Sequence, residues 1–388
     1  SCSYNKIDNC TISQNRRGID IPYYSEHVTI KNSKITNNEY GIIDYGRYTL
    51  NNQNKYLTLK NNNISDNLQY GVYQYYSDFS QIENNTINGN GMDGLIIRAS
   101  RKSTFYNNTM CHNGLNGIHL NVSHIHTIIH NTVSDNGGDG IYVYKANSNN
   151  VSYNEVQNND LNGIRIISSS NNLINANLIS GNGEAGILID PSFENIVKDN
   201  IISRNRFGII VKESEDNYFY NNSISNNDFG VYLDATSTNN LIYHNNFVDN
   251  EEQAVDLGDN SWSSDEGEGN YWSDYTGTDS DDDGIGDSSY QGLDENPLVI
   301  HWGISYKISD LVNDIYTMEL SKGTENSLIS KLNDAENLIS KGNYIGAVHK
   351  LRDLIDYVEA QIGKKITKEQ GDALIESALW IIYSISGY

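Results

Sequence analysis

Three groups of residues have types and spacings that could carry chemistry, and the first is an acidic run near residue 280. Carboxylates at its first, third and fifth positions, a glycine at the sixth, a backbone carbonyl at the seventh and a carboxylate at the ninth match a calcium loop of the EF-hand type. The twelfth position is Tyr290 instead of the usual glutamate, so we expect modest affinity, with Asp274 and Asp282 available to compensate. A solvated acidic loop is the alternative to this site. The run predicts a Ca²⁺ site with the ligands Asp279, Asp281, Asp283, Ile285 and Asp287.

The second group consists of tyrosine, histidine and arginine residues near the glycines of a 23-residue repeat. If the repeats stack as strands, residues two and four places after each glycine face outward on neighbouring strands. Aromatic faces suit sugar rings and arginine suits carboxylates, which predicts contact with an acidic glycan. An ordinary tyrosine-rich outer sheet face is the alternative. The predicted glycan-binding residues are Tyr73, Tyr75, Arg98, His119, Asn121, Tyr142, Tyr144 and Arg165.

The same residues could catalyse β-elimination or epimerisation of a uronic acid. Arg98 or Arg165 would neutralise the carboxylate of the sugar. His119 or Tyr142 would exchange protons at carbon 5 and at the leaving oxygen. Hydrolysis ranks below elimination, because Asp20 and Asp44 do not form a recognisable pair of carboxylates.

The third group is a set of histidines that falls within about one repeat. Capture of zinc or copper is one interpretation, and a solvated polar segment is the favoured alternative. The histidines are His112, His119, His124, His126 and His130.

The elements that must position these residues follow from the repeat itself. A glycine followed by an aliphatic residue recurs every 23 residues, with one spacing of 30 and two of 22. Three further apolar columns and two asparagine columns, from Asn62 to Asn245 and from Asn15 to Asn250, keep the same period. A coil of this length with three inward stripes is one turn of a parallel β-helix, in which asparagines tolerate left-handed corners and join one coil to the next. The repeated glycines are Gly18, Gly41, Gly71, Gly94, Gly117, Gly140, Gly163, Gly186, Gly208 and Gly230.

We therefore expect an all-β, right-handed parallel β-helix of about eleven coils over residues 1–260, followed by a small all-α domain. Between Gly41 and Gly71 about seven extra residues intrude, around Tyr45, Tyr48 and Tyr56. Insertions of this kind become surface loops on one face of a solenoid, often the binding face.

The columns resemble the NosD-like right-handed β-helix repeats, a family that also includes carbohydrate-binding and sugar-hydrolysing β-helices. After the last coil, the segment from Gly269 to Tyr275 reads GNYWSDY and is followed by DGIGD and, at Asn296, by NPL. This signature resembles the end of many secreted β-helix proteins of methanogenic archaea. Copper delivery, the role linked to the family name, finds no support here, because the chain has 3 methionines and no cysteine/histidine ligand spacing.

Residues 261–303 form an acidic calcium-loop linker, and residues 304–388 predict four helices. The pairs Leu311/Ile315, Leu328/Leu332 and Leu351/Ile355 have helical spacing. Gly342 and Gly363 suit helix ends, and Thr367 with Gln370 forms a capping box. This region resembles the FIMAH domain, a helical module of extracellular proteins, which implies an accessory role in interaction or in capping the solenoid.

Bulk composition limits the partners. The net charge of −24 would repel nucleic acid and anionic membranes, and no apolar run is long enough to span a membrane.

The chain starts inside the repeat pattern without a signal peptide, which predicts a processed or truncated product. Cys2 and Cys10 could pair, but Cys111 is left over, so no disulfide framework follows. Seven sequons fit a glycosylated surface protein, at Asn9, Asn63, Asn84, Asn107, Asn121, Asn150 and Asn221.

Together these features favour a secreted, non-catalytic scaffold or coat protein at the cell surface, braced by calcium and in contact with glycans. An uncapped first coil offers free backbone groups, so self-assembly end to end or in a lattice is part of this interpretation. Two alternatives remain open: a polysaccharide lyase or epimerase acting on acidic glycans, and a glycan-binding adhesin.

Overall fold

The computed structural model describes residues 3–47, 54–281, 283–339, 341 and 343–386. The chain divides into two compact units, which are described separately below. The first comprises Ser1–Asn222, Asn226–Ile242 and Asn250–Ser261, and the second comprises Ser223–Ser225, Tyr243–Asp249 and Trp262–Tyr388. The second unit therefore contains both the acidic segment and the helices, whereas the sequence analysis separates these two regions at residue 303.

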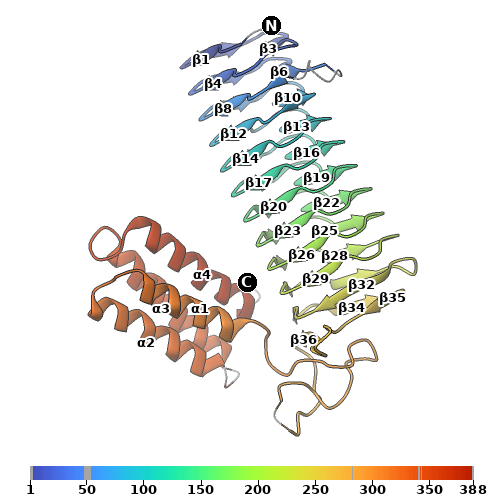
Figure 1. Ribbon diagram of the computed structural model, residues 1–388, viewed down its shortest axis with the longest axis vertical. Helices are drawn as coiled ribbons and strands as arrows, with labels where there is room; N and C mark the ends of the chain where they lie inside the picture. Colours follow the sequence, from blue (N-terminus) through green and yellow to red (C-terminus); the bar gives the residue numbers. More distant parts are fainter. Residues whose placement is uncertain (1–2, 48–53, 282, 340, 342, 387–388) are drawn as a thin grey trace. The chain divides into compact units, whose positions relative to one another are not determined.

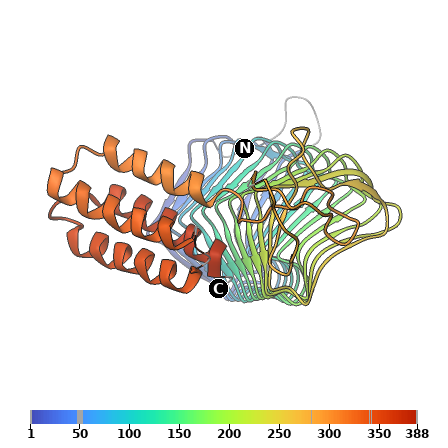
Figure 2. The same ribbon diagram turned by 90° about the horizontal axis from the view of Figure 1, so that it is seen from below.

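The first unit is a right-handed parallel β-helix of about eleven coils, as predicted (Figure 1). Its sheets run along the stack, and every strand pairs in parallel with the strand one coil away. Seen along the stack in Figure 2, the coils repeat almost the same outline.

The strands of the first unit form three long sheets and two short ones. One sheet contains, in order, β1 (Lys6–Asp8), β4 (Thr29–Lys31), β8 (Thr58–Lys60), β12 (Gln81–Glu83), β14 (Thr104–Tyr106), β17 (Thr127–Ile129), β20 (Asn150–Ser152), β23 (Leu173–Asn175), β26 (Ile196–Lys198), β29 (Tyr218–Tyr220), β32 (Thr238–Tyr243) and β35 (Asp259–Ser261). A second contains β3 (Arg17–Ile21), β6 (Tyr40–Tyr45), β10 (Val72–Tyr75), β13 (Leu95–Arg98), β16 (Ile118–Asn121), β19 (Ile141–Tyr144), β22 (Ile164–Ile167), β25 (Ala185–Asp190), β28 (Phe207–Val211), β31 (Phe229–Leu233) and β34 (Glu252–Asp256). To the third sheet the first unit contributes β15 (Thr109–Cys111), β18 (Thr132–Ser134), β21 (Glu155–Gln157), β24 (Leu178–Ser180) and β27 (Ile201–Ser203). The short sheets are β2 (Thr11–Ser13), β5 (Lys34–Thr36) and β9 (Asn63–Ser65), and β7 (Asn54–Lys55) with β11 (Ser77–Asp78).

The repeated glycines lie where successive coils approach most closely. A Cβ atom on Gly94 would lie 2.9 Å from the carbonyl oxygen of Gly117 and 2.8 Å from Nδ2 of Asn113. A carbon atom at these distances would displace its neighbours, so a residue without a side chain is required there. The inward columns, such as Ile82, Phe105 and Ile128, are fully buried and fill the space between the sheets.

Both asparagine ladders are present. The amide Nδ2 of Asn62 donates to Oδ1 of Asn85 at 2.9 Å, and that of Asn85 donates to Oδ1 of Asn108 at 3.0 Å. The expectation that these asparagines adopt the left-handed corner was wrong. The residue immediately before each ladder asparagine has the positive φ instead, for example Asn61 (φ 55°) and Ala176 (φ 51°).

A third ladder was not predicted, because its members are chemically mixed. Ser103 donates its backbone N–H to Nδ1 of His126 at 3.1 Å, and His126 donates its own to Oδ1 of Asn149 at 2.9 Å. From Asn149 onward the ladder consists of asparagines, beginning with the bond from Asn149 Nδ2 to Asn172 Oδ1 at 3.0 Å.

The predicted insertion falls between β6 and β7. Tyr45 ends β6 and Tyr56 follows β7, while Tyr48 lies outside the described residues. Cys10 and Cys111 form no disulfide among the described residues, and the pairing of Cys2 with Cys10 stays a prediction because Cys2 also lies outside those residues.

The second unit contains the signature segment, the acidic loop and four helices. Its strands are β30 (Ser223–Ser225), β33 (Asn246–Val248) and β36 (Tyr271–Trp272). The rings of Phe247, Trp272 and Tyr290 stack in that order, with centroids 4.4 and 4.1 Å apart. The buried carboxylate of Asp294 accepts the indole N–H of Trp272 at 3.0 Å, so the signature residues form the core of this segment.

The helices are α1 (Ile304–Thr317), α2 (Lys322–Ile339), α3 (Tyr344–Gln361) and α4 (Lys368–Ser386), which confirms the predicted four-helix domain. They share one apolar core that includes Leu311, Leu328 and Leu351. The capping box is also present, because Gln370 Oε1 accepts the N–H of Thr367 at 3.0 Å and Thr367 Oγ1 accepts that of Gln370 at 3.2 Å. Gly342 lies outside the described residues. None of the described helices is long and apolar enough to cross a membrane.

Candidate functional site

The predicted Tyr/His/Arg residues lie on neighbouring strands of the second sheet, from β10 to β22. The register pairs Tyr73 with Ile96, then with His119, Tyr142 and Arg165 on successive strands. The parallel column contains Tyr75, Arg98, Asn121, Tyr144 and Ile167. We call the outward residues of these five strands the outer face. Ile96 lies on it but is only 5% exposed, so the face is not uniformly open to solvent.

Three of the candidate catalytic side chains stack on one another. The ring centroids of His119 and Tyr142 are 4.8 Å apart and nearly parallel. The guanidinium carbon of Arg165 lies 5.0 Å from the Tyr142 centroid on the next coil. Partial burial raises the pKa of the Tyr142 phenol, although the positive charge of Arg165 opposes this. Tyr142 is therefore a neutral hydroxyl near neutral pH, able to donate a hydrogen bond.

Two buried aspartates support this stack, and the sequence reasoning missed both. Asp93 Oδ1 accepts the backbone and side-chain N–H groups of Asn116 at 3.0 and 2.6 Å, and its Oδ2 lies 3.4 Å from Nδ1 of His119. Asp139 repeats the arrangement two coils on: Oδ1 accepts from Asn162, and Oδ2 lies 3.5 Å from Arg165. The available signal was the alternation of Asp and Asn directly before the repeated glycines, at 93, 116, 139 and 162.

The stack leaves little room for proton transfer by His119. Its Nε2 atom is buried and has no hydrogen-bond partner among the described residues, and the same is true of Nε of Arg165. The other ring nitrogen of His119 faces Asp93. In this arrangement neither nitrogen of the imidazole is presented to a ligand on the outer face.

The remaining residues of the outer face are more open. Arg98 is exposed, and its Nη1 donates to the hydroxyl of Tyr73 at 3.4 Å. At the edge of this face, Lys145 directly follows β19, and its Nζ lies 5.0 Å from the ring centroid of Tyr144. Within the described part of the chain, neither Arg98 nor Lys145 has a carboxylate within ion-pair distance. Lys102, over the ring of Phe79, is another cation without a carboxylate partner in the described part of the chain, so this feature is not confined to these two residues.

The other sequence candidates do not join this site. Asp20 is exposed and pairs with Arg17 at 2.6 Å, whereas Asp44 points into the coil and is fully buried. Burial raises the pKa of Asp44, and its carboxylate accepts hydrogen bonds from Asn54 at 2.6 Å and from Gln74 at 3.2 Å. The two carboxylates therefore cannot act on one substrate.

The histidines are also dispersed. His126 is buried in the third ladder, and burial lowers its pKa to about 4. His124 Nδ1 accepts the N–H of Asn147 at 3.0 Å, and the ring of His130 stacks on that of Tyr153. Among the described residues, the only cluster of histidine, cysteine or carboxylate groups that could hold a metal is Asp279, Asp281 and Asp283.

The acidic loop has part of the expected geometry. Ligand oxygens of Asp279, Asp281 and Asp283 lie within 4.8 Å of one another. Gly284 at the sixth position has φ +90°, and its N–H donates to Oδ2 of Asp279 at 2.9 Å. This is the tight turn that the loop requires at that position.

The later positions of the loop depart from the pattern. Oδ2 of Asp287 accepts from the hydroxyls of Thr278 and Ser280 at 2.9 and 2.6 Å, which holds the loop closed. Tyr290 is buried and donates to Asp274 at 3.1 Å. Asp282 lies outside the described residues.

The predicted glycosylation sites are all accessible. None of the seven sequon asparagines is buried. Asn121 lies on the outer face itself, so a glycan there would cover part of the site.

Two family models match parts of the chain. "Periplasmic copper-binding protein (NosD)" matches residues 111–277, and "Right handed beta helix region" matches residues 25–177. Two curated relatives are probable ABC transporter binding proteins NosD, from Pseudomonas aeruginosa (48% identical) and Stutzerimonas stutzeri (45%), each over 65 residues. These matches cover 16% of this chain and 15% of each relative.

Solved structures show a likeness of fold. The A-modules of two mannuronan C-5 epimerases from Azotobacter vinelandii superpose with TM-scores of 0.58 and 0.55. Each superposition covers 65% of this chain and 77% or 79% of the other, at 16% and 14% sequence identity. At such identities the likeness concerns the fold alone.

Proposed function

We propose that this NosD-like, right-handed parallel β-helix protein is an exported, non-catalytic scaffold that binds acidic polysaccharide on its outer face. The observation that carries the proposal is the position of Arg98 and Lys145, which have no carboxylate partner among the described residues. Arg98 donates to the hydroxyl of Tyr73, and Lys145 lies over the ring of Tyr144. A polyanionic chain would gain charge-assisted hydrogen bonds from these cations, and its sugar rings would pack on the aromatic faces.

Binding without turnover fits the geometry better than catalysis. A proton exchanger must reach the hydrogen that it transfers. His119 has one ring nitrogen buried and the other directed at Asp93. Its raised pKa keeps the Tyr142 phenol protonated near neutral pH, so almost no phenolate is present to remove a proton. The outer face therefore exposes Arg98 to solvent and keeps both imidazole nitrogens of His119 away from a ligand.

The test is affinity electrophoresis through gels that contain polygalacturonate or alginate. We expect Arg98→Ala to weaken retardation about tenfold, because one charge-assisted contact contributes roughly 1.5 kcal/mol. Arg206→Ala is the matched control, since Arg206 also lies over a ring but pairs with Glu184. Equal retardation of wild type and Arg98→Ala in both gels would contradict the proposal.

A second candidate function, epimerisation or β-elimination of a uronic acid, is favoured by the cluster of Asp93, His119, Tyr142 and Arg165. Removal of the proton at carbon 5 and its return to the opposite face would give the epimer. Expulsion of the glycosidic oxygen instead would give an unsaturated sugar. Incubation with polyuronate in heavy water detects both, as deuterium at carbon 5 or as ultraviolet absorbance. Either product, absent with His119→Ala, would replace the binding proposal by an enzymatic one.

We also propose that the acidic loop binds Ca²⁺ through Asp279, Asp281, Asp283 and the carbonyl of Ile285, with Asp287 bracing the loop from outside. Oxygen ligands of this kind suit calcium, and the missing glutamate at the twelfth position predicts a Kd of about 10⁻⁴ M or weaker. Calorimetry should give calcium heat that is lost in Asp281→Asn and kept in Asp265→Asn, a second exposed acid of the same unit. Identical heats from the two variants would exclude the loop as the site.

A further inference from the structure

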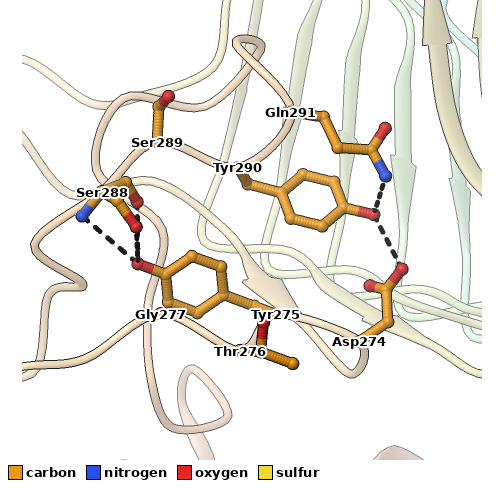
Figure 3. A pocket seen from close by; sticks show the side chains of 8 residues that line it. All are labelled: Asp274, Tyr275, Thr276, Gly277, Ser288, Ser289, Tyr290 and Gln291. Atoms are coloured by element: carbon orange, nitrogen blue, oxygen red, sulfur yellow. Dashed lines mark hydrogen bonds between the residues drawn. The ribbon is translucent and has the colours of Figure 1, made fainter.

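The signature segment forms a pocket that the proposed function leaves unexplained. The pocket has a volume of about 430 Å³, large enough for one or two sugar units and far larger than a single ion needs. Figure 3 shows two tyrosine rings and several polar side chains around it. The lining residues used here are Asp274, Tyr275, Thr276, Ser289, Tyr290 and Gln291.

One side of the pocket is a fixed hydrogen-bonded group. The Tyr290 ring is 5% exposed and stacks on Trp272, so its hydroxyl has a fixed position. That hydroxyl donates to Oδ2 of Asp274 at 3.1 Å and accepts from Nε2 of Gln291 at 3.0 Å. Asp274 and Gln291 are both exposed, and their carboxylate and amide oxygens can each accept more than one hydrogen bond, including one from a ligand hydroxyl.

The opposite side is the ring of Tyr275, which the chain holds in place. Its hydroxyl donates to the carbonyl oxygen of Ser288 at 2.7 Å. A Cβ on Gly277 or Gly286 would lie 2.0 Å from that hydroxyl, so the ring fits only because both neighbours are glycines. The ring is half-buried and is one of the lining groups of the pocket.

The chemistry of the lining selects the ligand class. One carboxylate that already accepts from Tyr290 makes a poor cation site, because Ca²⁺ and Mg²⁺ take six or more oxygen ligands. No lysine or arginine is among the lining residues, and Asp274 would repel an anion. Hydroxyls, an amide, one carboxylate and an aromatic face together match the hydroxyl groups and C–H faces of an uncharged sugar.

We propose that this pocket binds a neutral saccharide, a different class of ligand from the acidic chain proposed for the outer face. Asp274 and Gln291 accept hydrogen bonds from adjacent sugar hydroxyls, Thr276 and Ser289 provide further hydroxyl contacts, and the sugar ring packs against Tyr275. The signature is then a recognition element as well as a structural one.

The experiment is saturation-transfer NMR on the full chain in calcium buffer, with the methyl glycosides of glucose, galactose, mannose and N-acetylglucosamine at millimolar concentration. We expect transfer to at least one glycoside, and a Kd about tenfold higher in Gln291→Ala and in Asp274→Asn. Gln291 is an exposed residue, so its replacement does not threaten folding. Glu295→Gln, an exposed change in the same segment away from the pocket, should bind like wild type.

Three results would overturn the proposal. One is the absence of transfer to all four glycosides, and another is equal affinity of wild type, Gln291→Ala and Asp274→Asn. The third is displacement of the bound glycoside by polygalacturonate, which would assign the binding to the outer face. Persistence of the signal in Arg98→Ala together with its loss in Gln291→Ala would support the pocket and separate it from the proposed polyanion site.

Discussion

The asparagine ladder and the outer face are polar stripes on the same coils, but their hydrogen-bonding groups are used differently. Asn131 is 1% exposed. Its Oδ1 accepts the backbone and side-chain N–H groups of Asn108, both at 3.0 Å, and its Nδ2 donates to Phe105 and Asn154 at 2.9 Å. Arg98 is exposed, and its side chain makes a single long hydrogen bond of 3.4 Å to Tyr73.

The difference teaches that abundance of polar residues does not mark function in this chain. A ladder amide whose donors and acceptors are all satisfied within the protein has nothing left to offer a ligand. A side chain on the outer face keeps most of its donors for solvent or a partner. What separates the ladder from the outer face is whether the side chains have their hydrogen bonds satisfied within the protein, more than the residue types.

The largest expected effect is the replacement of a ladder residue. Asn131→Ala should lower the free energy of unfolding by about 3 kcal/mol or more, because it leaves buried groups of Asn108 and Phe105 without partners. Asn121→Ala, the same change on the outer face, should alter it by less than about 0.5 kcal/mol. Urea unfolding of the two variants measures the difference. Similar losses in both would break the distinction between the stripes.

A smaller effect concerns the one histidine in the third ladder. Burial lowers the pKa of His126 to about 4, below the value of about 6.5 expected in the unfolded chain. As the pH falls below about 6.5 the unfolded chain takes up a proton that the folded chain does not, so stability decreases until about pH 4. Asn at this position would not titrate. When the pH is lowered from 7 to 5, the free energy of unfolding should therefore fall by about 2 kcal/mol less in His126→Asn than in wild type.

Thermal unfolding at the two pH values tests this expectation. Other acid-sensitive groups, such as His301, are present in both proteins and cancel in the comparison. An equal loss of stability in wild type and in the variant would mean that His126 is not a source of acid sensitivity in the ladder.

The smallest effect concerns the corners between ladder and strand. Ala176 has φ 51°, a conformation that costs a residue with a side chain about 1 kcal/mol and glycine almost nothing. Ala176→Gly should therefore leave the protein unchanged or stabilise it by up to about 1 kcal/mol. Ala185→Gly, in strand β25, should destabilise it by about 1 kcal/mol. Melting temperatures that fall equally in both variants would argue against corner strain.

Much of the fold could be predicted because the same residue pattern recurs in coil after coil. The glycine column and the inward columns each recur with the same spacing, so chance variation at one coil is averaged out. The corners were misassigned, because their residues are as varied as Ala176 and His130, and asparagine at the next position is the conspicuous residue. The register of the outer face followed from the same period.

The supporting groups of the outer face could not be predicted in the same way. Asp93 and Asp139 look like ordinary polar residues before a glycine, and their role depends on burial and on the direction of each oxygen. The burial of His119 Nε2 could not be predicted either, because it depends on how the ring packs beside Tyr142. Sequence period gives the position of a side chain along the rod, but not which of its atoms remain accessible.

The spacing of the ladder bonds has a consequence for how such a gene can change length. Most ladder bonds join residues 23 positions apart, as between Asn131 and Asn154. Unequal recombination that gains or loses one block of 23 codons would restore every inward column, every glycine and every ladder bond across the join. The outer face would be altered instead, because its columns differ from coil to coil. The number of coils can therefore change with little cost to folding, whereas the order of the side chains displayed on the outer face changes with it.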